Sequence, residues 1–356
     1  MLFYFTKIRI ICTRLPNKVF ILVLYFLVSF CFTLQFSSCS DDPVSVPFTI
    51  APARYDWTFD TLSAAVDGIY AQDTNNVFFA DNWGNLIYYD GTTYHFNSCG
   101  NLAPESIGGY DKYNVYMGVY DQAMFLPKIL KWNGSAFTEI IITDTTSRYA
   151  EIKSIYVHTP NEVWFGTRNG RVYKYDGSSF TSFYFDSLMY IKPFLRDENN
   201  DLYFVGMINY IDPPPTDSSR EFIYKYVNNS WQKVYDKSWH NASDTGFSCL
   251  TNFGNTFIGA DRFGIYRFTG NYFSKIFQAP SFFSLALVAG NSISNIMCFG
   301  QNGEAVFYNW NSISWSKELI LKEHPNSLLE VQGQFYTNTF EPWRSIITRG
   351  KPKKGG

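Results

Sequence analysis

The feature that most constrains the fold is a short unit that recurs along the chain. Its clearest copy spans residues 152–180, where apolar runs are separated by the pairs Asn169-Gly170 and Asp176-Gly177. These pairs favour tight hairpins, because a type I′ turn needs positive φ angles at two successive residues. Four short strands joined by three tight turns are therefore expected, and they would form one antiparallel sheet.

The same unit appears at several other places. The step from Val77 to Gly91 repeats the 14-residue step from Val163 to Gly177. Further copies centre on Val115, Leu202, Phe257 and, more weakly, Ile296. An aromatic residue stands three positions past the last turn in most copies, and we interpret it as a core residue that fills the wedge between neighbouring sheets.

The seventh copy is incomplete. Residues 327–331, 334–337 and 345–348 supply three strands, and the chain then ends without a fourth. Near the other end, residues 55–59 read as an outer strand with the expected aromatic, Trp57, but without a sheet of their own. Pairing the strand at 55–59 with the incomplete seventh sheet would close the ring and protect strand edges from aggregation. We therefore predict an all-β, seven-bladed β-propeller of four-stranded antiparallel blades, closed by the N-terminal strand.

The repeat resembles those of secreted seven-bladed propellers, which include the regulator-type repeats and the photosystem II assembly factor-like propellers. The shared pattern is a Val-Trp-like pair, two spaced glycines, an Ile or Val, a Tyr or Trp, an Asp-Gly or Asn-Gly turn and a final aromatic, as in residues 163–180. The resemblance covers about residues 50–350. It implies an architecture and little chemistry, because propellers support binding, scaffolding and catalysis alike.

Composition agrees with a sheet protein and excludes one class of partner. Aromatic residues make up 19% of the chain, which suits half-buried pleated sheets. Residues 39–356 carry 25 Lys and Arg against 31 Asp and Glu. We expect no nucleic acid partner, because nucleic acid binding depends on a basic surface.

Residues 1–38 have the parts of a secretory signal. Four basic residues precede an apolar run of 18 residues, 19–36, and Ser37-Ser38 then lead to Cys39. This arrangement resembles the lipobox of bacterial lipoproteins, in which the Cys becomes the acylated first residue, although Phe36 replaces the usual Leu. The alternative is an uncleaved membrane anchor, since 18 apolar residues barely span a bilayer.

The segment after Cys39 predicts where the protein resides. Ser40-Asp41-Asp42-Pro43 is acidic, and it resembles signals that send some Gram-negative lipoproteins to the outer face of the outer membrane. We expect a lipid-anchored protein of the bacterial outer membrane, and the sequence leaves both orientations open, at the cell surface or facing the periplasm. The predicted organisation is a signal peptide at 1–38, a lipidated tether at 39–50, a propeller at 51–350 and a basic tail at 351–356.

Three cysteines remain after the signal and the lipidation site are set aside. Cys99, Cys249 and Cys298 have no metal-ligand spacing. We expect free, buried thiols, and a disulfide between Cys249 and Cys298 across neighbouring blades is the alternative.

Loop lengths predict a binding face. In a four-stranded blade, the turns from the second to the third strand and the connections between blades share one side of the ring, which we call the long-loop face. The longest predicted excursions fall there, at residues 120–128, 207–220 and 236–246. Loops on a rigid scaffold often carry function. Candidate ligand-binding residues on this face are Trp83, Tyr120, Phe125, Arg168, Tyr210, Trp239, His240, Arg262 and Phe263.

Three carboxylates form a second predicted group. Asp67, Glu105 and Glu151 each start a predicted inner strand, in blades one, two and three. They would lie on adjacent sectors of the channel mouth, where they could hold Ca²⁺, share protons or only form a hydrated acidic rim.

These observations favour a binding protein over an enzyme. Signature motifs of zinc proteases, serine hydrolases and phosphate-binding loops are absent from the sequence, and its four histidines fall in separate repeats. We expect a monomeric, non-enzymatic recognition or scaffold propeller that binds a glycan or a protein through the long-loop face, without a cofactor. The alternative is a polysaccharide-active enzyme that uses Asp67, Glu105 or Glu151.

Overall fold

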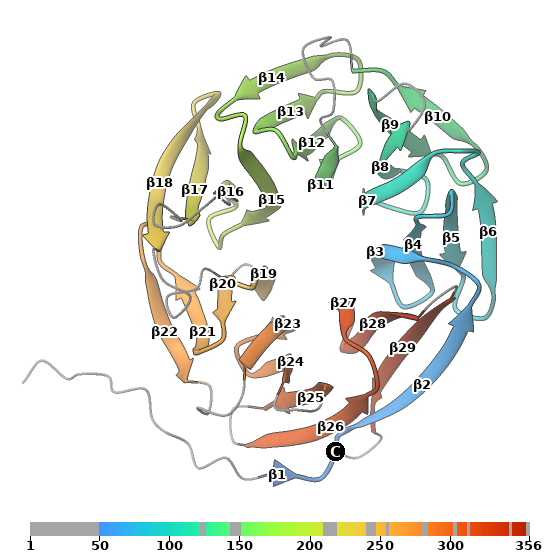
Figure 1. Ribbon diagram of the computed structural model, residues 1–356, viewed down its shortest axis with the longest axis vertical. Helices are drawn as coiled ribbons and strands as arrows, with labels where there is room; N and C mark the ends of the chain where they lie inside the picture. Colours follow the sequence, from blue (N-terminus) through green and yellow to red (C-terminus); the bar gives the residue numbers. More distant parts are fainter. Residues whose placement is uncertain are drawn as a thin grey trace, which may run out of the picture. The chain divides into compact units, whose positions relative to one another are not determined.

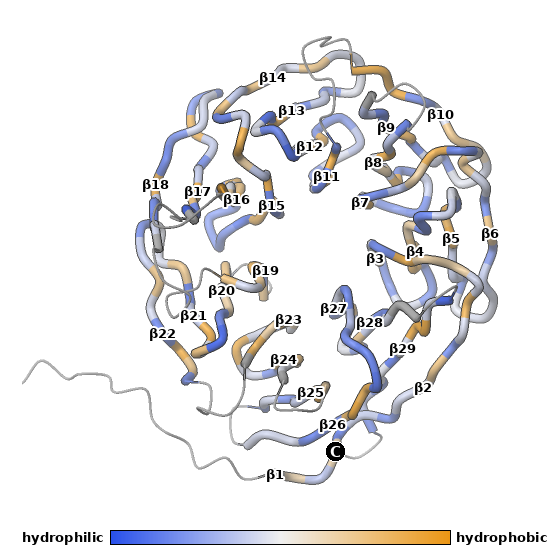
Figure 2. The backbone as a smooth tube through the Cα atoms, in the orientation of Figure 1, coloured by the Kyte–Doolittle hydropathy of each residue, from blue (hydrophilic) through white to orange (hydrophobic). Residues whose placement is uncertain are grey.

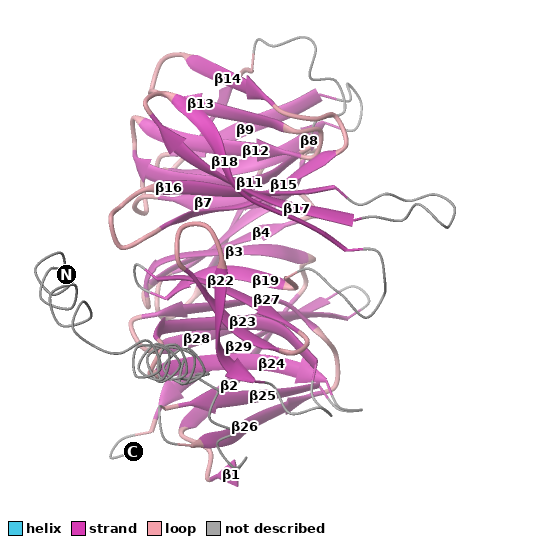
Figure 3. Cartoon of the chain, turned by 90° about the vertical axis from the view of Figure 1, so that its left-hand side faces the viewer, coloured by secondary structure: helices cyan, strands magenta, loops and turns pink. Residues whose placement is uncertain are grey.

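The computed structural model describes a ring of seven antiparallel sheets. It describes residues 50–121, 126–142, 151–208, 219–239, 247–253, 256–278, 284–301, 305–311, 314–341 and 344–353. Figure 3 shows strands and connecting loops in these ranges and no helix. The described residues accordingly contain no helix with the length and hydropathy needed to cross a bilayer.

The first four blades follow one another along the chain, and each has four strands in sequential order. Their bounds are β3 (Val66–Asp73), β4 (Asn76–Asp81), β5 (Asn85–Tyr89), β6 (Tyr94–Ser98), β7 (Ala103–Gly109), β8 (Val115–Asp121), β9 (Leu126–Trp132), β10 (Phe137–Ile140), β11 (Ile152–Thr159), β12 (Glu162–Thr167), β13 (Arg171–Tyr175), β14 (Phe180–Tyr184), β15 (Met189–Arg196), β16 (Leu202–Ile208), β17 (Ser219–Val227) and β18 (Ser230–Trp239). Figure 1 shows the first strand of each blade at the centre and the last at the rim.

The remaining blades include the closure of the ring. Their strands are β19 (Cys249–Phe253), β20 (Thr256–Asp261), β21 (Gly264–Phe268), β22 (Phe273–Gln278), β23 (Ser284–Ser292), β24 (Asn295–Gln301), β25 (Ala305–Trp310), β26 (Trp315–Leu321), β27 (Pro325–Val331), β28 (Gln334–Glu341) and β29 (Arg344–Pro352), with β1 (Ile50–Ala51) and β2 (Tyr55–Leu62) from the N-terminal side. The seven-bladed β-propeller predicted from the repeats is confirmed.

Strand β2 completes the seventh blade. It pairs antiparallel with β29 over eight residues, from Tyr55 opposite Pro352 to Leu62 opposite Ser345. The strand is longer than the five residues expected, and β29 reaches Pro352, two residues into the segment predicted as a tail. Strand β1 adds a second contact that the sequence did not predict, because it pairs in parallel with β26 of blade six.

A buried carboxylate fixes the crossing from blade six to blade seven. Glu318 on β26 is 7% exposed and accepts hydrogen bonds from the backbone N–H groups of Arg54 and Tyr55 at 2.9–3.0 Å. The Arg54 guanidinium donates to Asn309 and Ser314 of the same blade. The chain therefore binds blade six before it enters blade seven.

The hydrophobic core is divided among the seams between blades. Figure 2 shows hydrophobic positions recurring in every blade. Buried side chains of the described residues form seven clusters, one at each seam. The predicted wedge aromatic of each blade lies in the cluster that its blade shares with the preceding blade, and these residues are Trp57, Tyr94, Phe137, Phe180, Trp231, Phe273 and Trp315. Their interpretation as core residues is confirmed.

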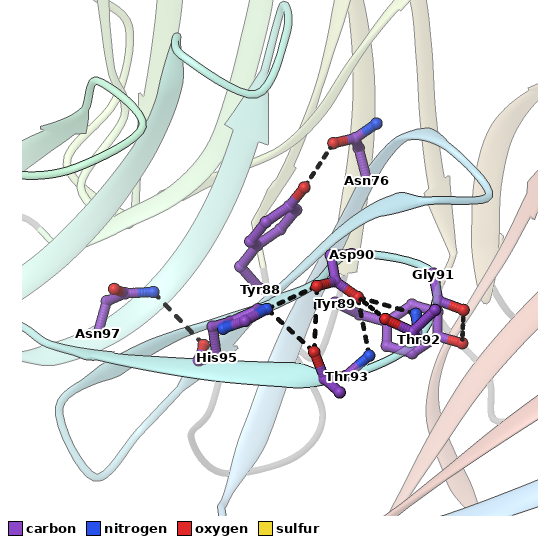
Figure 4. Close-up of polar contacts among 9 residues, drawn as sticks. All are labelled: Asn76, Tyr88, Tyr89, Asp90, Gly91, Thr92, Thr93, His95 and Asn97. Atoms are coloured by element: carbon purple, nitrogen blue, oxygen red, sulfur yellow. Dashed lines mark hydrogen bonds and ion pairs between the residues drawn. The ribbon is translucent and has the colours of Figure 1, made fainter.

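The turns on the side opposite the long-loop face, which we call the turn face, are stabilised locally. Asp90 accepts hydrogen bonds from the backbone N–H groups of Thr92 and Thr93, both at 2.8 Å, and it forms an ion pair with His95 at 2.7 Å (Figure 4). The turn at Asp176 repeats the backbone contacts. These hydrogen bonds hold the pKa of Asp90 well below its usual range, with the His95 contact as the largest cause.

Candidate functional site

The first strands of the blades enclose a polar cavity on the ring axis. Its volume is about 540 Å³, and residues of blades one, two, three, four, five and seven line it. It lies where these strands begin, which is the long-loop face. Four charged side chains line it: Asp67, Glu105, Lys153 and Lys192.

Strand periodicity explains why these side chains reach the cavity. On β11, Ile152 and Ser154 are buried in the blade seams, so the residue between them, Lys153, points the other way. On β15, Met189 and Ile191 are buried, and Tyr190 and Lys192 alternate with them. Apolar residues thus hold the strand in the ring, and the alternate positions supply the lining.

Lys153 joins two blades by ion pairs. Its Nζ lies 3.0 Å from Oε2 of Glu105 on blade two and 2.8 Å from Oε2 of Glu151 on its own blade. Arg168 contacts the same Glu151 oxygen at 3.2 Å from the turn between β12 and β13. The Lys153 side chain is 21% exposed, so this network is only partly screened by solvent.

The three predicted carboxylates differ in their electrostatics. Burial raises the pKa of Glu105 and of Asp67, and Lys153 opposes both shifts. Burial also acts on Glu151, but hydrogen bonds from Lys153 and Arg168 outweigh it and lower the pKa of this carboxyl. Asp67 accepts a hydrogen bond from the Asn82 amide at 2.7 Å.

Two of the three carboxylates that the sequence offered for a cation site, Glu105 and Glu151, form ion pairs with Lys153. Lys153 occupies the position between Glu105 and Glu151 where a metal ion would lie. In the part of the chain that the structure describes, there is no group of three His, Cys, Asp or Glu residues arranged to hold a metal. The physical reason is that residues two positions apart on a strand face the same side. Lys153 therefore points to the channel mouth beside Glu151.

The opposite wall of the cavity carries a cation and a hydroxyl. Within the described ranges, neither the Lys192 ammonium nor the Tyr190 hydroxyl has a hydrogen-bond or ion-pair partner. Burial raises the pKa of Tyr190, which therefore stays a hydroxyl donor. The cavity is thus acidic on blades one and two and has donor groups on blade four.

A buried carboxyl lies near Lys192, in the seam between blades four and five. Glu221 on β17 has no solvent exposure, and one of its oxygens accepts a hydrogen bond from the Phe247 N–H at 3.4 Å. Within the ranges that the structure describes, its other oxygen has no hydrogen-bond partner. Burial raises the pKa of Glu221 to about 7, and the charges of Lys192 and Lys237 oppose the shift.

The candidate ligand-binding residues are spread over several blades. Trp83 lies in the turn between β4 and β5 and is 45% exposed. Arg262 and Phe263 form the turn between β20 and β21, with the guanidinium 4.5 Å from the ring centre. Arg168 contacts Glu151. These residues share the long-loop face, but blades one, three and five supply them, so they form no single aromatic platform.

Two candidates lie in strands instead of loops. Tyr120 is part of β8 and pairs with Pro127, because the hairpin between β8 and β9 continues to Asp121 and Leu126. The long excursion predicted at residues 120–128 is therefore wrong. Trp239 ends β18 and pairs with Ser219, so the excursion predicted from residue 236 starts later. Phe125, Tyr210 and His240 lie outside the described residues, as does Cys39.

The three remaining cysteines are free thiols. Cys249 and Cys298 both belong to the core cluster between blades five and six. Burial raises the pKa of the Cys298 thiol well above its usual value. The expectation of free thiols is confirmed and the alternative disulfide is not formed, but only Cys298 is buried, and Cys99 and Cys249 are half-buried.

A second cavity, of about 270 Å³, lies on the turn face between blades four and five. Its charged residues already have partners: Lys225 pairs with Asp201 at 2.5 Å, Arg267 pairs with Glu198 at 3.4 Å, and Asp197 accepts a hydrogen bond from the Tyr203 hydroxyl at 2.9 Å. The central cavity differs because Lys192 has no such partner in the described part of the chain.

Sequence reasoning did not predict Lys153, Tyr190, Lys192 or Glu221. The first three could have been found by extending the search along each predicted inner strand at every second position. Glu221 had no comparable signal, because its burial depends on how blade five packs against β17.

Comparisons with known proteins agree on the architecture alone. No protein-family model matches the chain, and no curated protein matches its sequence. A structure of YCF48 bound to D1 peptide is 10% identical, covers 88% of this chain and 99% of its own, and has a TM-score of 0.62. YCF48 from Cyanidioschyzon merolae is 12% identical over 82% of this chain and 98% of its own, with a TM-score of 0.58. BamB from Moraxella catarrhalis is 9% identical over 83% and 99%, with a TM-score of 0.52. At these identities the likeness shows a shared propeller fold.

Proposed function

We propose that this chain is a non-enzymatic recognition or scaffold propeller that binds a protein or peptide segment through its long-loop face. The observation that carries the proposal is the central cavity, where charged groups from four blades meet on a rigid ring. Concave sites with a few convergent polar groups are the usual ligand sites of proteins. The structural neighbour bound to D1 peptide is a propeller with a peptide ligand, which makes this class of ligand physically reasonable for the fold.

A protein ligand is preferred to a neutral glycan. Glycan binding usually relies on aromatic faces that stack on sugar rings, but Trp83 and Phe263 belong to blades one and five, which are not neighbours. The polar cavity instead presents carboxylates and an ammonium group. Charged side chains of a polypeptide complement such a lining more directly.

The cellular setting is part of the proposal. The sequence motif at Cys39 supports a lipid anchor on the bacterial envelope, and several acyl chains would hold the protein stably. Metabolic labelling with a palmitate analogue should mark the wild-type chain and fail to mark Cys39→Ala. Continued labelling of Cys39→Ala would contradict the lipid anchor.

The binding face can be tested with matched aromatic substitutions. Trp83→Ala and Phe263→Ala remove exposed side chains from the long-loop face, and Tyr113→Ala and Tyr272→Ala remove exposed side chains from the turn face. After chemical crosslinking in native cells, we expect the full chain to recover a defined partner. That recovery should fall in the first pair of variants and stay unchanged in the second pair. Loss only in the turn-face variants would contradict the proposal.

One observation favours a second candidate, a polysaccharide-active enzyme. Because Lys153 Nζ lies 3.0 Å from one carboxylate oxygen and 2.8 Å from the other, Glu105 and Glu151 are close together, and their pKa values shift in opposite directions. Such a pair is typical of acid–base catalysis. The binding proposal is preferred because the Lys153 ammonium fills the space between the carboxylates, where a scissile sugar bond would have to lie.

Hydrolysis assays separate the two candidates. Aryl glycosides and polysaccharides incubated with the purified full chain should show no release of product. Hydrolysis that is lost in Glu105→Gln and Glu151→Gln and kept in Glu139→Gln, an exposed carboxylate on β10, would establish the enzyme instead.

A further inference from the structure

The central cavity has a charge polarity across the ring. Asp67 and Glu105 stand on blades one and two, and Lys192 stands on blade four, three blades further round from Asp67. The two sides therefore offer different partners to a bound molecule. One side accepts hydrogen bonds and favours a cation, and the other donates hydrogen bonds and favours an anion.

The acidic side is incompletely neutralised. Lys153 is the cation that contacts Glu105, and it shares its charge with Glu151. Asp67 accepts a hydrogen bond from an uncharged amide. Partial desolvation raises the pKa values of both Asp67 and Glu105, and a further positive charge nearby would favour their ionised forms.

The basic side of the cavity carries donor groups that would gain from a bound anion. Among the residues that the structure describes, Lys192 and Tyr190 have no hydrogen-bonding partner for their donor groups. The charge of Lys192 acts on the Glu221 carboxyl through space, but that carboxyl accepts its hydrogen bond from the Phe247 N–H. An anion in the cavity would therefore supply Lys192 with a direct partner.

We infer that the cavity binds a short peptide segment that carries one basic and one acidic side chain, with the basic group toward Asp67 and Glu105 and the acidic group toward Lys192 and Tyr190. This inference rests on the proposed function and specifies its ligand. A simple anion would leave Asp67 without a contacting cation and Glu105 with only the Lys153 that it shares with Glu151, and a simple cation would leave Lys192 without an anion. A volume of about 540 Å³ lies within the usual range for sites that hold a small organic molecule or a few residues.

Four capped pentapeptides test the inference by calorimetric titration of the purified full chain. They are Ala-Lys-Ala-Glu-Ala, the two versions in which Gln replaces either Lys or Glu, and the version in which Gln replaces both. We expect the doubly charged peptide to bind about tenfold tighter than either singly charged one, because each charge-assisted contact contributes roughly one factor of ten. Equal binding of all four peptides, or no binding by any, would overturn the inference.

Substitutions assign each charge to its side of the cavity. In Lys192→Met, the peptide Glu should no longer increase the affinity, whereas the peptide Lys should still increase it. Lys192→Arg should restore most of the affinity gained from the peptide Glu. Asp67→Asn should have the complementary effect. Lys112→Met on the turn face is the matched control and should change neither affinity gain. Circular dichroism and thermal unfolding check that each variant folds. If both affinity gains survive in Lys192→Met and Asp67→Asn, the cavity is not the site.

This result is separable from the test of the binding face. Crosslinking that depends on Trp83 and Phe263, together with peptides that do not discriminate by charge, would keep the proposed function and reject the charge-paired ligand. Failure of both experiments would reject both.

Discussion

The two faces of the ring use charged side chains in different ways. On the turn face, Asp90 and Asp176 each accept hydrogen bonds from backbone groups two and three residues further along the chain. On the long-loop face, Lys153 joins Glu105 and Glu151, which belong to different blades. A charge with local partners stabilises a turn wherever the repeat occurs. A charge whose partner comes from another blade depends on how the blades pack, as the pair of Arg267 with Glu198 also does on the turn face. The long-loop face differs because charged side chains of four blades converge there, at the central cavity.

The largest difference between the faces should appear at glycines with positive φ. Gly170, in the turn between β12 and β13 on the long-loop face, has a φ of 73°. A Cβ added there would meet the backbone oxygen of Asp186 at 1.8 Å. We expect Gly170→Ala to lower the free energy of unfolding by about 4 kcal/mol, because the connection to blade four must move. Urea unfolding followed by tryptophan fluorescence measures this loss. A loss below about 1 kcal/mol would show that the connection adapts freely.

The next effect concerns the lysine that joins two blades. Lys153→Met leaves Glu105 without its cation, and Glu151 keeps only Arg168. We expect urea unfolding to show a loss of stability of about 2 kcal/mol at pH 8, because a half-buried charge without its partner is costly.

The pH dependence of this variant follows from the carboxyl pKa values. Without Lys153, the pKa of Glu105 in the folded protein rises further above its unfolded value, so the folded state takes up the proton first as the pH falls. The loss of unfolding free energy in Lys153→Met relative to wild type should therefore become smaller as the pH falls from 8 to 5. The double variant Lys153→Met/Glu105→Gln should show less of this pH dependence, and a deficit that does not change with pH would contradict the assignment.

A gain in stability is expected at Glu221. Its pKa is about 7 in the folded chain against an ordinary value of 4.5, so ionisation opposes folding above pH 7. The folded state binds the proton more tightly, and wild-type stability should therefore fall as the pH rises from about 4.5 to 7. We expect Glu221→Gln to raise the free energy of unfolding by about 2 kcal/mol at pH 8 and by little at pH 4. Thermal unfolding at both pH values measures the difference, and an equal effect at both would contradict it.

The fold could be predicted from sequence because its signals are local. Blades one, two, three and six carry Asn-Gly or Asp-Gly pairs, most copies have a following aromatic residue, and these features depend on residues close in the chain. The antiparallel pairing of the N-terminal strand with β29 followed from counting strands, since the seventh copy lacked one. The pairing of β1 with β26 had no such signal, because a two-residue parallel contact leaves no periodic pattern.

The candidate site could be predicted only in part. The positions of Asp67, Glu105 and Glu151 near the channel mouth followed from strand order, and the structure places the first two in the cavity wall. The ion pairs of these carboxylates did not follow from strand order, because the contact of Lys153 with Glu105 depends on how blades two and three pack. Tyr120, expected in a loop, continues a strand instead, because its hairpin is longer than the repeat suggests.

The smallest effect sharpens the contrast between the faces. Gly270, on the turn face between β21 and β22, has a φ of 97°, but a Cβ added there would meet no heavy atom within 4 Å. The cost of Gly270→Ala is therefore the backbone conformation alone, and we expect a loss of about 1 kcal/mol with no change in peptide binding. Urea unfolding and the peptide titration measure the two quantities on the same sample. A loss as large as that of Gly170→Ala would mean that turn-face loops are held as firmly as long-loop-face turns. The difference between the faces would then reside in their charges and not in their packing.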